Sequence, residues 1–226
     1  MALVSKKLKD GSLAEFEFGQ EDKDVLILKI DNIMHSAVNI ADQSIIVFDY
    51  VKEVKKQVDA VFYPGQSLNC LFLGGGAYSL ARALESERSA STQKVIEINQ
   101  EIIDFVENTI PLGKNSRIDV VCGDAKTEIY NEDIGGPFNF IFIDVFSGPD
   151  YPQWALEKDY ISKVYELLAP GGLIAMNITD NFSMKNTTVQ INNSVSVSGQ
   201  RLVVAAFPPS TGSKYRNVIL SYRKKH

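Results

Sequence analysis

Residues that bind transition metals or form disulfides are scarce in this chain. Its 226 residues include only two cysteines and two histidines. Cys70 and Cys122 each fall within an apolar run typical of a core strand, so we expect both thiols to be buried and reduced. We therefore expect neither a metal site nor a redox role.

Long apolar runs and an excess of basic charge are also missing. No stretch approaches the ~18 apolar residues of a membrane-spanning helix. The N-terminal segment MALVSKKLKD has no apolar core of signal-peptide length, so we expect a cytoplasmic protein that does not bind a membrane. A formal net charge of −5 argues against nucleic acid as a partner and is compatible with a cationic substrate.

The chain is long enough for one sizeable core with a small appendage. Short runs in residues 1–42 alternate apolar and polar side chains with a period of two, as half-buried strands do. We expect a small antiparallel β region at 1–42, followed by an α/β domain at 43–226. The strands of the β region are expected at 13–18, 25–30 and 33–40.

The nine residues NCLFLGGGA, at 69–77, are the most informative stretch. Four apolar residues favour a strand buried on both faces, and Gly74, Gly75 and Gly76 follow it directly. A helix-compatible run comes next, which completes the first βα unit of a nucleotide-binding sheet. Glycines let a ligand approach main-chain N–H groups closely. Glu97 ends the next apolar strand, near the position where such folds place a carboxylate for ribose hydroxyls.

Strands and helices alternate through the rest of the chain. Asp42 or Ser44 is expected to cap a helix that starts near Ile45. The stretch 186–198 is rich in Asn, Ser and β-branched residues, and we interpret it as a weak helix or an irregular segment. Further strands are expected at 94–98, 118–122, 138–143, 173–177, 202–207 and 217–222, and helices at 100–108, 125–130 and 159–168.

Polar residues follow the predicted strands at the edge where α/β sheets bind ligands. Besides the glycine turn, these strand ends carry Glu97, Asp124, Asp144 and Asn177. Ser79 stands where G-x-G-x-x-G would need its third glycine, and no G-K-[ST] follows, which excludes a P-loop. Because the turn also lacks a basic residue for a pyrophosphate, a nucleoside without phosphates fits better than NAD or ATP.

Five blocks of sequence resemble the spermidine synthase family, and most closely its short actinobacterial members. They are GGGA at 74–77, VIEIN at 95–99, GDA at 123–125, IFIDVFSG at 141–148 and LAPGG at 168–172. The resemblance implies a Rossmann-like, S-adenosylmethionine-dependent methyltransferase fold preceded by a small β region. It also implies transfer of an aminopropyl group from decarboxylated S-adenosylmethionine to putrescine, which yields spermidine and methylthioadenosine.

The resemblance implies a role for each matching residue. Gly74, Gly75 and Gly76 would pack against the nucleoside and the methionine-derived part of the donor. Glu97 would accept both ribose hydroxyls. Asp124 would accept the adenine amino group, and Ala125 would offer its N–H to the ring. Asp144 would hold the aminopropyl ammonium or the incoming amine.

The chain departs from the family pattern at several positions. The family carries a second acid after the fourth core strand, but here that position is Ser147, whose hydroxyl cannot act as a general base without an activator. Asp150 is a candidate replacement. His35 stands where the family has a pocket-lining glutamine, and is either a base or structural. Tyr151 and Trp154 either wall a polyamine channel or pack the following helix.

Three functions stay open from the sequence. The first is an aminopropyltransferase acting on a diamine or polyamine, with activity reduced by Ser147. The second is a methyltransferase that uses intact S-adenosylmethionine, and the third is a non-catalytic nucleoside-binding relative. We also expect a homodimer. Binding and turnover of the two donors distinguish these functions.

Overall fold

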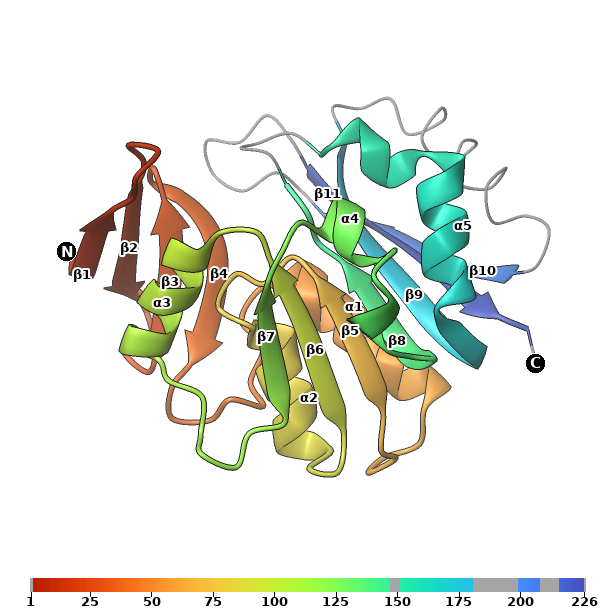
Figure 1. Cartoon of the computed structure of the whole chain (residues 1–226). Helices are drawn as coiled ribbons and strands as arrows, with labels where there is room; N and C mark the ends of the chain where they lie inside the picture. The colour runs from red at the N-terminus through yellow and green to blue at the C-terminus, as the bar shows by residue number, and fades with distance from the viewer. Residues whose placement is uncertain (1, 147–150, 181–198, 208–215, 226) are drawn as a thin grey trace.

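The structure, a computed structural model, contains two sheets (Figure 1) and describes residues 2–146, 151–180, 199–207 and 216–225. The smaller sheet is antiparallel, with four strands in the order β1-β2-β3-β4. The larger sheet has seven strands in the order β10-β11-β9-β8-β5-β6-β7. The small sheet lies beyond the β7 edge of the large sheet, on the side of α3 (Figure 1).

The small sheet follows the alternating pattern of its sequence. Alternate side chains of β2, Ala14 and Phe16, are buried. The strands are β1 (Ala2–Lys7), β2 (Leu13–Phe18), β3 (Val25–Ile30) and β4 (Ile33–Asn39). Strand β1 was not predicted, because this edge strand exposes both Leu3 and Val4 and so lacks an apolar alternation.

The small sheet shares its hydrophobic core with the rest of the molecule. The rings of Phe16 and Phe105 on α3 (Gln100–Thr109) lie 5.2 Å apart. The backbone N–H of Lys9 donates to Glu101 Oε2 of the same helix at 2.8 Å. The two sheets are therefore packed together through α3.

The large sheet is buried on both faces, as the apolar run of β5 (Asn69–Leu73) predicts. Cys70 and Phe72 join one hydrophobic cluster, whereas Leu71 and Leu73 join the other. The parallel strands are β5, β6 (Thr92–Glu97), β7 (Ile118–Cys122), β8 (Phe138–Ile143) and β9 (Leu168–Asp180). Strand β11 (Arg216–Lys224) pairs antiparallel with β9, and β10 (Gly199–Ala206) pairs antiparallel with β11.

Helices cover both faces of this sheet (Figure 1). One face packs against α1 (Asp49–Val61), α2 (Ser79–Glu87) and α3. The other face packs against α4 (Ala125–Glu128) and α5 (Lys158–Glu166), together with the 3-10 turns η1 (Glu132–Ile134) and η2 (Gln153–Leu156). The chain runs from β5 to β6 and β7 on one side and returns to β8 on the other, so the order of strands switches at β5.

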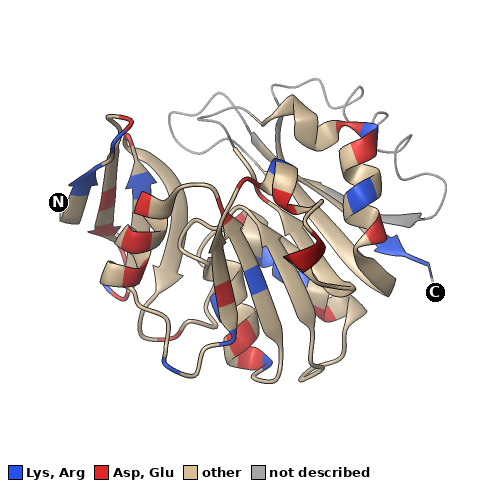
Figure 2. Ribbon diagram, viewed as in Figure 1, with Lys and Arg blue, Asp and Glu red and all other residues tan. Residues whose placement is uncertain are grey.

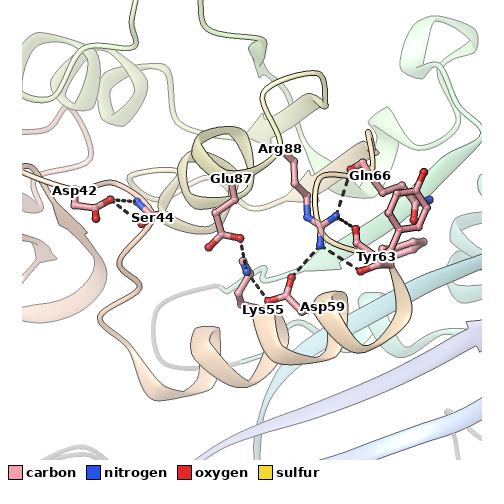
Figure 3. Close-up of polar contacts among 9 residues, drawn as sticks. Asp42, Ser44, Lys55, Asp59, Tyr63, Gln66, Glu87 and Arg88 are labelled. Carbon is pink, nitrogen blue, oxygen red and sulfur yellow. Dashed lines mark hydrogen bonds and ion pairs between the residues drawn. The ribbon is translucent and has the colours of Figure 1, made fainter.

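Three predictions about these elements are wrong. Helix α1 begins at Asp49 rather than near Ile45, because Asp42 Oδ1 accepts the Ser44 N–H and hydroxyl in a local turn (Figure 3). Cys122 is exposed rather than buried because it ends β7, which lies at the edge of the sheet. The strand expected at 173–177 begins earlier, because β9 runs from Leu168 to Asp180 and pairs with β8 through a register shift.

The remaining boundaries differ from the predictions by only a few residues, and Cys70 is buried as expected. The stretch 186–198 lies outside the described residues. Within the described parts of the chain, no helix combines the length and the apolarity that crossing a membrane requires.

Candidate active site

The glycine turn after β5 packs directly on the end of β8. Gly74 has a φ of +100°, and a Cβ at this residue would lie 2.1 Å from the carbonyl oxygen of Asp144. No side chain fits in that space, so glycine is required at this position. The turn therefore lies against the backbone of Asp144.

The carboxylate of Glu97 lies on the other side of the turn. Its Oε2 accepts the N–H groups of Gly75 at 3.0 Å and Gly76 at 3.4 Å, and its Oε1 accepts the N–H of Asn99 at 3.0 Å. An ionised carboxylate offers about four acceptor positions, so Oε1 retains capacity for a ligand hydroxyl. The predicted pairing of glycine turn and acid is present in the structure.

Asp124 and Ala125 lie at the end of the next strand. Asp124 Oδ1 caps α4 by accepting the N–H of Lys126 at 2.8 Å, which leaves Oδ2 for another donor. The hydroxyl of Tyr160 donates to the Ala125 carbonyl at 3.2 Å, which fixes this turn from α5. Acidic residues mark the ends of β6 and β7 and the turn into α4 (Figure 2).

An apolar residue at this edge, Ile98, was not predicted as a site residue. Its side chain is 68% exposed, directly after Glu97, and the exposed Cys122 lies opposite Glu97 on β7. An exposed isoleucine between two polar residues is a weak signal on its own. In this position it offers an apolar surface to a flat ring.

Asp144 is held by two side chains from distant parts of the sequence. The Tyr50 hydroxyl, from α1, donates to Asp144 Oδ2 at 3.2 Å. Asn177 Nδ2, from β9, donates to Asp144 Oδ1 at 2.8 Å. Burial raises the pKa of Asp144 to about 6, although both hydrogen bonds act to lower it. Burial and the charge of Asp144 raise the pKa of Tyr50, which therefore keeps its proton.

The groups around Asp144 leave mainly acceptors for a ligand. Because Nδ2 of Asn177 donates to the carboxylate, its Oδ1 is an acceptor, and this buried atom has no hydrogen-bond partner among the described residues. Tyr50 has given its only hydrogen to Asp144. An alkylammonium group has three donors and no acceptor, so it matches this cluster.

Helix α1 is fixed to α2 by an ionic network (Figure 3). Lys55 Nζ lies 2.6 Å from both Asp59 Oδ2 and Glu87 Oε2. The buried guanidinium of Arg88 donates to Asp59 Oδ1 at 3.0 Å and to the Tyr63 carbonyl at 2.7 Å. The helix that carries Tyr50 is thus anchored to the helix that follows the glycine turn.

Strand β4 brings a further residue, Ser36, to the turn. A Cβ at Gly76 would lie 3.1 Å from Ser36 Cβ and 3.9 Å from the carbonyl oxygen of His35. His35 is the extra residue of a bulge, because Met34 and Ser36 pair with adjacent residues of β3. Burial lowers the pKa of His35, which is therefore neutral at physiological pH.

The segment after β8 is described only in part. Ser147 and Asp150 lie outside the described residues. Tyr151 is buried and packs edge-on against Phe146, with ring centroids 5.9 Å apart, and Trp154 packs similarly on Tyr160. Trp154 thus contacts the following helix, α5, through Tyr160, whereas the ring contact of Tyr151 is with Phe146. The Tyr151 hydroxyl is buried without a hydrogen-bond partner in the described part of the chain.

A separate groove of about 550 Å³ lies at the amino-terminal ends of the strands, where Thr92, Lys94 and Arg117 line it. It includes none of the predicted site residues. Across the described ranges, no three His, Cys, Asp or Glu side chains gather in a way that could hold a metal ion.

The sheet and the position of its site define the class of S-adenosylmethionine-dependent methyltransferase folds. Human methyltransferase-like protein 13, solved in complex with SAH, matches with a TM-score of 0.63 and 16% identity over 80% of this chain and 83% of that one. A probable spermidine synthase from Corynebacterium glutamicum ATCC 13032 matches with a TM-score of 0.80 and 20% identity over 99% of this chain and 79% of that one. At these identities the likeness establishes the fold, which confirms the predicted fold class.

The sequence narrows this class to a family. Residues 60–218, more than half of the chain, match the spermine/spermidine synthase domain, and the chain belongs to this family. The polyamine aminopropyltransferase of Vibrio vulnificus (strain CMCP6) is 22% identical over 129 residues, which are 57% of this chain and 43% of that relative. The chain thus spans less than half of that relative. The family that the sequence resemblance indicated is confirmed. The two alternative functions, a methyltransferase and a non-catalytic relative, are not favoured.

Proposed function

We propose that this protein transfers an aminopropyl group from decarboxylated S-adenosylmethionine to a diamine such as putrescine. The observation that carries the proposal is the cluster of acceptors around Asp144, which matches an alkylammonium group. The nitrogen of the acceptor amine attacks the carbon next to the donor sulfonium. The carbon–sulfur bond breaks, its electron pair stays on sulfur, and methylthioadenosine leaves.

The donor would bind along the carboxyl edge of β5, β6 and β7. In this proposal the ribose hydroxyls donate to Glu97, which the N–H groups of Gly75 and Gly76 already orient. The adenine amino group donates to Asp124, the ring accepts from the Ala125 N–H, and Ile98 provides an apolar contact. Gly74 lets the methionine-derived part pass close to Asp144.

Asp144 would bind the acceptor amine as an ammonium group and accept the proton that this group must lose before its nitrogen can attack. An amine with a pKa near 10.4 is only about one part in a thousand neutral at pH 7.4. A carboxyl group with a pKa of about 6 is ionised at that pH and accepts protons more readily than an ordinary aspartate. Tyr50 and Asn177 orient the carboxylate.

Ser147 is expected to make the reaction slow at neutral pH. A second general base would contribute ~100- to 10,000-fold, and the serine at this position cannot provide it. Turnover should therefore rise toward pH 9 as free amine accumulates. Asp150 and His35 remain the alternative bases in this proposal, and Tyr151 remains a candidate wall of the amine pocket.

The division into residues 1–42 and 43–226, the homodimer and the cytoplasmic location also remain proposals. The first rests on the change of architecture between the two sheets, with β4 reaching the glycine turn through Ser36. The other two rest on the family resemblance. Sedimentation equilibrium of the purified protein tests the dimer.

The function is tested by incubating purified protein with each donor and a panel of diamines at pH 7.4 and pH 9. We expect methylthioadenosine from the decarboxylated donor in the presence of a diamine, and none without it. Formation of S-adenosylhomocysteine from the intact donor would instead identify a methyltransferase. Tight binding of methylthioadenosine without any turnover would identify a non-catalytic relative.

A further inference from the structure

Tyr78 has a backbone conformation that its residue type rarely adopts. Its φ of 60° and ψ of 28° place it in the left-handed region, directly after the glycine turn and at the start of α2. Two other non-glycine residues with positive φ, Asp31 and Asn32, lie in a hairpin turn and are of types that tolerate it. A glycine at position 78 would avoid the strain, so the contacts of the Tyr78 ring must offset the free-energy cost of this backbone conformation.

The ring of Tyr78 is buried between α2 and the region of α3. It is 2% exposed and lies over the guanidinium of Arg82, whose Cζ is 5.5 Å from the ring centroid. Arg82 is itself buried and donates to the carbonyls of Ala77 at 3.1 Å and Ile110 at 2.6 Å. The ring thus lies on a guanidinium that links the C-terminal end of the turn, at Ala77, to Ile110 at the end of α3.

The backbone of Tyr78 is linked to the carboxylate of Glu97 through the glycine turn. The Tyr78 N–H donates to the Gly75 carbonyl at 2.9 Å, and the Gly75 and Gly76 N–H groups donate to Glu97 Oε2. The Tyr78 hydroxyl is buried without a hydrogen-bond partner among the described residues, and burial followed by the charges of Glu107 and Glu97 raises its pKa. Among the described residues the side chain of Tyr78 therefore contacts the framework through its ring, over Arg82, and not through a hydrogen bond of its hydroxyl.

We propose that Tyr78 is a positioning residue, whose buried ring holds the glycine turn so that the Gly75 and Gly76 N–H groups orient Glu97 for a nucleoside. Because the side chain is anchored and the backbone is strained, the turn has one arrangement even without a ligand. The inference rests on the proposed function only for the identity of the nucleoside.

The first test uses the unmodified protein and native-state amide hydrogen exchange. If the ring holds the turn, the Gly75 and Gly76 amides open together with the Tyr78 and Arg82 amides, and their protection factors agree within tenfold. Protection of the two glycine amides that is more than 100-fold weaker than that of Tyr78 would overturn the proposal. This measurement needs neither a variant nor a ligand.

The second test compares Tyr78→Gly, which keeps the backbone conformation, with Tyr78→Phe, which keeps the ring. We expect at least tenfold faster exchange at Gly75 and Gly76 and at least tenfold weaker methylthioadenosine binding in Tyr78→Gly. Tyr78→Phe should stay within threefold of the unmodified protein on both measures. Phe138→Ala removes a buried ring at the opposite edge of the sheet and is the matched control.

The outcomes separate the inference from the proposed function. Two results would overturn the positioning role. One is unchanged exchange of the Gly75 and Gly76 amides in Tyr78→Gly. The other is exchange of these two amides that is accelerated as much in Phe138→Ala, with the Phe142 amide as the reference in each variant. An unmodified protein that does not bind methylthioadenosine would contradict the proposed function, while the exchange rates would still decide the role of Tyr78. If Tyr78→Gly fails to fold, the exchange pattern of the unmodified protein decides.

Discussion

At the scale of single residues, the proposed activity and the stability conflict most clearly at Asp144. Its carboxyl pKa is 3.8 in an unfolded chain and about 6 in the folded protein, so the folded protein binds the proton more tightly between these values. The free energy of unfolding therefore falls as pH rises from about 4 to about 6, and stays lower above that range. The ionised form that the proposed reaction needs is the form that destabilises the fold.

Replacing Asp144 with asparagine should therefore stabilise the protein above pH 6. The two-unit difference in pKa corresponds to ~1–3 kcal/mol, because one unit is about 1.36 kcal/mol. Thermal unfolding should show a higher Tm for Asp144→Asn at pH 8 and little difference at pH 4. A variant that is less stable than the unmodified protein at pH 8 would show that the charge is compensated by contacts beyond Tyr50 and Asn177.

Glu97 should be required both for nucleoside binding and for the shape of the glycine turn. Charge-assisted hydrogen bonds are worth ~1.5–3 kcal/mol each, so losing two of them in Glu97→Ala should weaken methylthioadenosine binding at least ~100-fold. Since three backbone N–H groups donate to this carboxylate, Glu97→Ala should also lower the free energy of unfolding. Glu97→Gln, which keeps an acceptor, should retain more stability. Calorimetry with less than threefold change in affinity would remove Glu97 from the site.

Ser147 should limit the rate rather than the binding of the donor. We expect Ser147→Asp to raise the rate of methylthioadenosine release at pH 7.4 at least ~10-fold, since it introduces a carboxylate where the family carries one. The affinity for methylthioadenosine should stay within threefold. A fast unmodified protein that Ser147→Asp slows would place the base elsewhere, and Asp150→Asn and His35→Gln would be the next variants to measure.

At the scale of elements, the features that depend on neighbouring residues were the ones predicted from the sequence. The apolar run of β5, its glycine turn and the acid after β6 were all predicted, because each depends on neighbouring residues. The predicted start of α1 was wrong because Asp42 accepts hydrogen bonds from Ser44 rather than from the helix. The bulged entry into β9 and the exposure of Cys122 depend on sheet pairing, which the sequence does not display.

For the candidate site, individual residues were predicted from the sequence, but the contacts that join them were not. Tyr50 was not predicted as a site residue, because its bond to Asp144 joins residues 94 positions apart. Asn177 was recognised as a strand end but not as a partner of Asp144. Ser36 reaches Gly76 only because the small sheet packs beside the turn. These contacts arise from tertiary packing, and no spacing in the sequence indicates them.

Arg88 should be the main anchor between α1 and α2. In Arg88→Ala, the Asp59 carboxylate and several carbonyls around Tyr63 lose a buried donor, which should lower the free energy of unfolding by ~2–4 kcal/mol. Lys52→Ala is the control, because its pair with Asp49 is exposed and should contribute less than ~0.5 kcal/mol. Urea unfolding of both variants checks this. Equal losses in the two variants would contradict the anchoring role.

At the scale of the whole molecule, the two sheets and the helices between them bring three chain segments to one edge. The small sheet supplies Ser36 through β4, α1 supplies Tyr50, and the strand ends supply the acids. Because the small sheet shares a core with α3, it cannot be regarded as a detachable addition. The net charge of −5, with acids at the ends of β6 and β7, would also favour the approach of the cationic substrate that we propose.

The most direct test of the acceptor cluster is to titrate the methylthioadenosine complex with putrescine and with 1,4-butanediol, which has the same chain but no charge. Calorimetry at pH 8 should show binding of putrescine, at least ~10-fold weaker binding of the diol, and at least ~10-fold weaker binding of putrescine to Asp144→Asn. Equal affinities for putrescine and the diol, or for the two proteins, would contradict an ammonium site at Asp144.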